Sequence, residues 1–176
     1  MIIKSKNHEW VEWVQAIVFA VVIAYIIKFF LFDIIEVDGN SMYPTLHDKD
    51  RLIVSKINYK EPNIGDIIIF KYPADENLDF IKRIVAKEGD KVEIKNNYLY
   101  INNKKIEEPY INDKQLNDFS EVIVPENSFF VLGDNRNSSR DSRYSDVGFL
   151  DEDNIKGKAI IRIWPIESVG ILNRKR

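Results

Sequence analysis

The chain of 176 residues contains no cysteine and only two histidines, His8 and His47. Without cysteine there is no disulfide framework, thiol nucleophile or thiolate metal site. The scarcity of histidine also argues against a zinc site, and nothing in the composition indicates a cofactor. The net charge of −3, with acidic and basic residues mixed along the chain, gives no basic footprint for nucleic acid. We therefore expect neither a metal, a cofactor nor a nucleic-acid partner.

Charge is almost missing from residues 14–32 (VQAIVFAVVIAYIIKFFLF), where only Gln15 and Lys28 are strongly polar. As a helix this run would span ~28 Å, close to the ~30 Å hydrocarbon thickness of a bilayer. Trp10 and Trp13 would anchor its near end at the interface. A buried core helix is the alternative, but a helix that is apolar all round is hard to bury in so small a domain. We predict a transmembrane helix over residues 14–32.

The residues on either side of this run predict whether it is cleaved off and how it is oriented in the membrane. No A-x-A cleavage pattern follows, so we expect a retained anchor rather than a cleaved signal peptide. Lys4 and Lys6 precede the run and acidic residues follow it, which places residues 1–13 in the cytoplasm by the positive-inside rule. Residues 33–176 would then form an extracytoplasmic domain of a single-pass protein, with the lipid bilayer as a partner.

Helical periodicity is nearly absent after residue 35, and short β-type runs separated by Gly-Asp or Asn-Asn turns replace it. Asn pairs on both sides of residues 98–101 predict consecutive hairpins. The segment from about 92 to 120 shows no candidate chemistry and is interpreted as an inserted hairpin subdomain. We predict a mainly β protein, with an all-β domain folded as a compact barrel or sandwich. The other predicted strands cover residues 51–54, 67–70, 80–85, 122–124, 129–132 and 159–164.

A small polar stretch, GNSMYPTL at residues 39–46, follows the apolar run closely. Pro44 fixes its own φ and restricts the residue before it, so Ser41 is followed by rigid chain. Serine in a turn usually serves the backbone, and a nucleophilic role requires a base nearby. His8 would lie on the cytoplasmic side of the membrane, and His47 suits a turn on the same local segment.

Lys82 is the better candidate for the base. If residues 80–86 form a strand, Lys82 shares one face with three apolar side chains. Apolar surroundings disfavour the ammonium ion and lower the pKa of a lysine, which leaves a neutral amine able to accept a proton. The alternative is an ordinary strand lysine whose amine reaches solvent.

A polar loop, GDNRNSSRDSR at residues 133–143, follows the predicted strand that ends at Leu132. Its hydroxyls, amides and paired charges can tie the loop to itself and hold other side chains. A calcium loop is the alternative, but Arg136 and Ser138 stand where ligands are needed, and three arginines would repel the ion.

Four segments in this order resemble bacterial type I signal peptidases, particularly the short Gram-positive form with one N-terminal span. They are GNSMYPTL, GDIIIF, FIKRIVAKEGD and GDNRNSSRDSR, which begin at residues 39, 65, 80 and 133. The resemblance implies an all-β catalytic core with a smaller β insertion, located in the bacterial cell membrane. It also implies exported preproteins as substrates, cut after small residues in an Ala-x-Ala pattern, and the secretion translocon as a further candidate partner.

The resemblance implies roles for individual residues. Ser41 would be the nucleophile, with its backbone N–H as the oxyanion donor, and Lys82 the general base. Ser139 would orient the lysine amine, while Asp141 and Arg143 would form an ion pair that braces the loop. Asp134 and Arg136 would give structural support, and the substrate pockets would be lined by Ile35, Val37, Met42, Leu46, Ile81 and Ile84.

Some positions depart from that family's pattern. Gly39 stands where some relatives carry a serine that assists the oxyanion, and losing one such donor costs other hydrolases ~2.7–4 kcal/mol. Lys49 stands where a glycine is frequent, and Phe80 replaces a frequent tyrosine. Two other functions stay open at this point. One is a catalytically silent, membrane-tethered relative that binds preproteins, and the other is a self-cleaving Ser–Lys protease of the repressor type.

Overall fold

A computed structural model describes residues 6–56, 62–112 and 117–172, with side chains at all of these positions except 6–9 and 26–30. Residues 1–5 of the predicted cytoplasmic segment, and the side chains of His8 and Lys28, therefore lie outside the described part.

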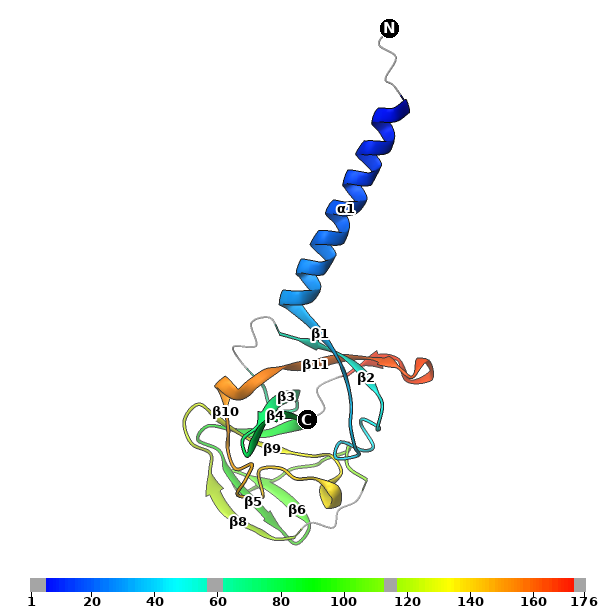
Figure 1. Ribbon diagram of the computed structural model, residues 1–176. Helices are drawn as coiled ribbons and strands as arrows, with labels where there is room; N and C mark the ends of the chain where they lie inside the picture. Colours follow the sequence, from blue (N-terminus) through cyan, green and yellow to red (C-terminus); the bar gives the residue numbers. More distant parts are fainter. Residues whose placement is uncertain (1–5, 57–61, 113–116, 173–176) are drawn as a thin grey trace.

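A single long α-helix, α1 (Lys6–Leu31), stands out from the rest of the molecule (Figure 1). It covers the predicted apolar run except for Phe32, which begins strand β1. Large apolar side chains of α1 between Trp10 and Tyr25 are exposed. Among the described residues, no helix combines the length and the apolar character needed to cross a membrane.

The predicted mainly β fold is confirmed, because the described residues after α1 form two antiparallel sheets and only short 3-10 turns. The first sheet has the strand order β1-β2-β11-β3-β4-β9-β10, with β12 paired to β11. Its strands are β1 (Phe32–Glu36), β2 (Arg51–Ser55), β3 (Ile67–Tyr72), β4 (Asp75–Lys87), β9 (Ser128–Leu132), β10 (Leu150–Asp151), β11 (Ile155–Trp164) and β12 (Gly170–Ile171). The 3-10 turns are η1 (Arg136–Ser138), η2 (Glu152–Asn154) and η3 (Ile166–Ser168).

The second sheet is formed by the segment that the sequence analysis predicts as an insertion. In strand order it contains β7 (Lys104–Lys105), β6 (Tyr98–Ile101), β5 (Lys91–Lys95) and β8 (Phe119–Ile123). The Asn pairs at 96–97 and 102–103 have φ between 52° and 68°. Two consecutive residues with positive φ are what a type I′ hairpin turn requires, and this is why the Asn-Asn dipeptides mark both turns.

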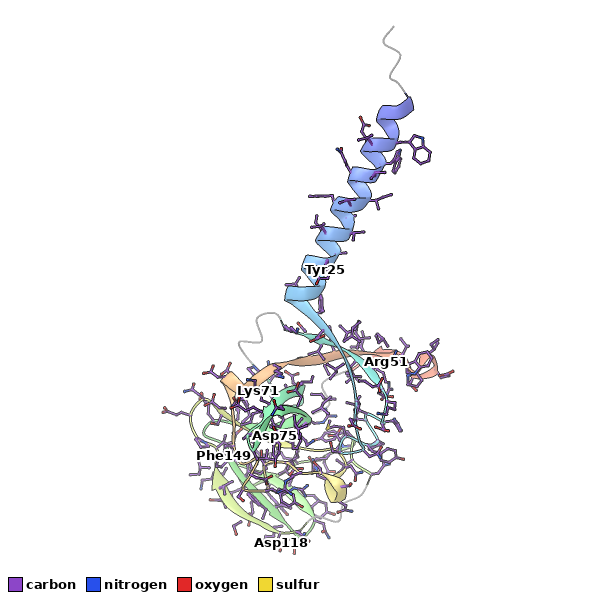
Figure 2. All side chains as sticks on the ribbon, in the orientation of Figure 1. Tyr25, Arg51, Lys71, Asp75, Asp118 and Phe149 are labelled. Atoms are coloured by element: carbon purple, nitrogen blue, oxygen red, sulfur yellow. The ribbon has the colours of Figure 1, made fainter. Side chains whose placement is uncertain are left out.

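The domain extends away from the end of α1, and its core consists of buried apolar clusters. Figure 2 places Asp118, just before β8, at the end of the domain opposite α1. Three clusters of buried apolar side chains form the core. The cluster nearest the candidate site contains Val37, Met42, Leu46, Leu52, Val54, Ile67, Ile69 and Ala159.

Candidate active site

Ser41 is held in a tight turn by the apolar residues that follow it. Met42 and Leu46 are buried in the cluster beneath the turn, and the Leu46 amide donates to the Met42 carbonyl at 2.9 Å. Before the serine, Gly39 has a φ of +89° and its amide donates to an Asp48 carboxylate oxygen at 2.8 Å. Only glycine adopts this backbone region without strain, so the turn is built to fix the serine from both sides.

Lys82 of β4 contacts the serine directly. Its Nζ lies 2.8 Å from Ser41 Oγ and 2.8 Å from the carbonyl oxygen of Ile81. The same nitrogen lies 4.9 Å from the centre of the Phe80 ring, and the residue is only 3% exposed. The structure thus brings together the two residues that the sequence pairs, and it buries the amine beside the ring of Phe80.

Burial has a chemical consequence for this amine. Desolvation lowers the pKa of Lys82 from 10.5 to about 8, although the negative charges of Asp141 and Asp134 act in the opposite direction. At pH 7 about one amine in ten is then neutral, compared with fewer than about one in a thousand for an ordinary lysine. Lys82 can therefore serve as a proton acceptor near neutral pH.

The polar loop of residues 133–143 is braced by the predicted ion pair. Arg143 Nε lies 2.7 Å from Asp141 Oδ1, and the other carboxylate oxygen accepts from the Gly133 amide at 3.0 Å. Arg143 Nη2 also donates to the carbonyl oxygen of Arg136 at 2.8 Å. The pair therefore joins the start, the middle and the end of the loop.

This loop also holds the backbone of the nucleophile. The Asn135 amide donates to the Ser41 carbonyl, and the Asn135 side chain donates to the Asn40 carbonyl, both at 3.0 Å. A Cβ on Gly133 would stand 2.2 Å from Ser139 Oγ and 2.5 Å from the Ser41 carbonyl oxygen. Glycine is needed here because the loop and the serine turn approach too closely for any side chain.

Ser139 differs from its expected role of orienting the lysine amine. Its hydroxyl oxygen is buried, yet it has no hydrogen-bond partner among the described residues. Lys82 Nζ instead donates to Ser41 Oγ and to the Ile81 carbonyl. The backbone of the lysine's own strand thus provides the contact that was expected from the serine.

Asp134 finds its partner outside the loop, in Arg83 of β4. The two form a doubly hydrogen-bonded ion pair of 2.8 and 2.6 Å, and both side chains are at most 1% exposed. Arg83 also donates to the Gly65 carbonyl at 2.9 Å, and the Thr45 hydroxyl donates to Asp134. Arg83 is not among the site residues that the sequence predicts. Strand alternation places it on the face of β4 opposite Lys82.

A cleft of about 730 Å³ opens beside Ser41 and Lys82, between the end of β1 and β4. Of the six predicted pocket residues, Ile35, Val37 and Ile81 line it. Met42 and Leu46 do not line it, because both are buried in the core cluster that contains Val37. The other residues that line the cleft are Glu36, Asp38, Gly39, Asn40, Ile69, Leu78, Asp79, Phe80, Ser138 and Arg140.

The placement of Ile84 in this pocket is wrong. Ile84 is fully buried in another cluster, with Ile68 and Val131, and its amide donates to the Asp66 carbonyl at 2.9 Å. Ile84 packs in this core cluster and is not among the residues that line the cleft beside Lys82.

Comparisons with known proteins show which family the chain resembles. The family described as "Signal peptidase, peptidase S26" matches residues 10–164. Signal peptidase I T of Bacillus subtilis (strain 168) is 41% identical over 178 residues, which cover 94% of this chain and 91% of that protein. Signal peptidase IB of Staphylococcus aureus (strain N315) is 38% identical, covering 89% of this chain and 91% of that protein. A crystal structure of a signal peptidase I from Enterococcus faecalis V583 matches with a TM-score of 0.50 and 33% identity, over 56% of this chain and 96% of that chain.

Proposed function

The chain belongs to the signal peptidase family, peptidase S26, and we propose that it is a membrane-anchored serine endopeptidase that removes signal peptides from exported preproteins. The observation that carries this proposal is the 2.8 Å contact between Lys82 Nζ and Ser41 Oγ, buried beside an open cleft. Ser41 is the nucleophile and Lys82 the general base.

The neutral amine of Lys82 takes the hydroxyl proton as Ser41 Oγ attacks the scissile carbonyl. The resulting ammonium then gives that proton to the leaving amine, and an acyl-enzyme remains. Lys82 next activates a water molecule that releases the signal peptide's new carboxyl end. The Ser41 backbone N–H is the oxyanion donor, and in the described part of the chain no group accepts a hydrogen bond from it.

The strand edges beside the cleft support an extended substrate. Within the described residues, β1 pairs only with β2, and residues 79–82 of β4 pair only with β3. Both unpaired edges border the cleft, so a peptide between them can add to the sheet through backbone hydrogen bonds. Alternate side chains of that peptide would face Ile35, Val37 and Ile81, which favours small residues of the Ala-x-Ala type.

The end of the domain next to α1 supports a position at the bilayer surface. One isoleucine from each of four neighbouring strands occupies a directly paired position, and such partners share one face of a sheet. They are Ile34, Ile53, Ile161 and Ile171 of β1, β2, β11 and β12. Ile34 and Ile171 are 50% and 72% exposed, and Trp164 and Ile166 beyond them are also exposed.

With the exposed apolar side chains of α1 and the apolar run at residues 14–32, this surface suits a single-pass anchor in the bacterial cell membrane. The N-terminus is then cytoplasmic and the catalytic domain extracytoplasmic. In this position the cleft faces preproteins as they leave the translocon.

Cleavage of a preprotein by the full chain in detergent tests the function. We expect release of the signal peptide by the wild type and by His47→Ala, and none by Ser41→Ala or Lys82→Ala. A catalytically silent relative would bind the preprotein without cutting it, and a self-cleaving protease would cut its own chain. Cleavage by Lys82→Ala at the wild-type rate would refute the assignment of the base.

A further inference from the structure

Glu108 lies in the connector between β7 and β8, far in sequence from the segments that form the site. Both of its carboxylate oxygens accept from Arg136, at 2.7 Å from Nη1 and 2.5 Å from Nη2. The two residues are only 7% and 2% exposed. A buried, two-point pair of this kind fixes the angle of the guanidinium plane as well as its distance.

Tyr110 fixes the carboxylate from the other side. Its hydroxyl donates to Glu108 Oε1 at 2.8 Å, and its ring lies 4.2 Å from Cζ of Arg83, the neighbour of Lys82. Burial raises the pKa of the Tyr110 hydroxyl, so the hydroxyl stays a donor. Glu108 is therefore held by the same buried assembly that packs against the strand of the base.

Arg136 passes this restraint to the nucleophile. Its Nε donates to the Gly133 carbonyl at 3.0 Å, and its own carbonyl accepts from Arg143 at 2.8 Å. Between these two points lies Asn135, which donates from its backbone and its side chain to the Ser41 and Asn40 carbonyls. The position of Arg136 thus sets the position of the peptide unit that carries Ser41.

We infer that Glu108 is a positioning residue for the Ser41–Lys82 site, and that the connector of the inserted sheet serves catalysis by locking Arg136. The inference rests on the proposed function. Without the Glu108 carboxylate, the buried guanidinium of Arg136 keeps its charge and has to move toward other acceptors. The Gly133 carbonyl is then released, and the loop no longer holds the serine at the distance that proton transfer requires.

Glu108→Gln tests the inference against its exposed neighbour, because Glu107→Gln removes the same charge one residue away. Both variants are assayed as full chains in detergent, at a temperature where circular dichroism shows each to be folded. We expect Glu108→Gln to lower kcat by about 10–100-fold with KM within about twofold, because a displacement of ~1 Å in a site costs that much. Glu107→Gln should match the wild type.

If Glu108→Gln does not fold, Tyr110→Phe carries the test, since it removes a single hydrogen bond to the carboxylate. We expect a smaller loss, of a few fold, that again falls on kcat. The double variant Glu108→Gln with Arg136→Gln should lose no more activity than Arg136→Gln alone, because Glu108 acts through Arg136.

Three results would overturn the inference: wild-type kcat in the folded variant, a loss that falls on KM alone, or single losses that multiply in the double variant. If Glu108 had only a structural role, the folded variant would keep the wild-type kcat and would only have a lower unfolding temperature. Failure of the wild type to cleave the preprotein would instead refute the proposed function, so the two outcomes are distinguishable.

Discussion

Replacing Lys82 by methionine should stabilise the protein at neutral pH while abolishing cleavage. In the folded chain burial lowers the pKa of this amine from 10.5 to about 8. That difference corresponds to about 3 kcal/mol, which the folded state loses at pH 7 by holding a protonated amine in an apolar setting. Methionine has a similar length and carries no charge, so it removes this cost.

The variant also loses two hydrogen bonds, to Ser41 Oγ and to the Ile81 carbonyl. At about 1 kcal/mol each, they offset about 2 kcal/mol of the gain. The free energy of unfolding of Lys82→Met should therefore exceed that of the wild type by about 1 kcal/mol at pH 7.

The pH dependence gives the sharper test. Because the folded pKa lies below the unfolded one, the cost is fully present below pH 8 and fades as pH rises toward 10.5. The difference in unfolding free energy should thus change by about 3 kcal/mol over this window and reverse in sign, with the wild type the more stable above it. Urea unfolding of both full chains in detergent, from pH 6.5 to about 11, measures it.

Lys87→Met is the matched control, because Lys87 is an exposed lysine at the end of the same strand. The difference in unfolding free energy between Lys87→Met and the wild type should not depend on pH. A pH-independent difference for Lys82→Met as well would refute the buried, low-pKa amine.

Three further predictions concern the pH profile and two backbone positions. The kcat/KM of the wild type should rise with pH to a plateau, with a midpoint near the pKa of about 8 of Lys82, and a midpoint near pH 10 would contradict the assigned base. Lys49→Gly should stabilise the chain by up to about 1 kcal/mol, measured by thermal unfolding, because Lys49 has a φ of +68°; an unchanged or lower unfolding temperature would count against this strain. Gly133→Ala should abolish cleavage, because its Cβ would stand 2.2 Å from Ser139 Oγ, whereas Gly170→Ala, with open space around its Cβ, should cleave normally.

Features of the fold and of the site that depend on local chain geometry could be predicted from the sequence. The Asn-Asn turns follow from the tolerance of Asn for positive φ, which is a property of the dipeptide itself. Lys82 could be placed among apolar neighbours because strand alternation fixes its face within a few residues. The Asp141–Arg143 pair, which the resemblance to type I signal peptidases implies, joins residues only two positions apart.

Contacts between distant segments could not be predicted in this way. Arg83 and Asp134 are 51 residues apart, and Glu108 and Arg136 are 28 apart. Glu107 and Glu108 are chemically identical neighbours, and only the packing of the inserted sheet decides that the second is buried. The pocket residue Ile84 was misplaced for a related reason, since which apolar side chains reach a cleft depends on how the strands are arranged around it.

Burial lowers the pKa of Lys82, and the arginines around the site keep the two nearby carboxylates from pairing with its amine. Asp134 and Asp141 both raise the pKa of Lys82, and either would hold the amine protonated if it paired with it directly. Each is instead bound by an arginine, Asp134 by Arg83 and Asp141 by Arg143. Arginine keeps its charge at any working pH and matches a carboxylate with two donors, so these pairs stay occupied while the amine titrates. The adjacent cations of β4 thus have complementary roles: the arginine engages the carboxylate, and the lysine beside it stays free to become neutral and accept the serine proton.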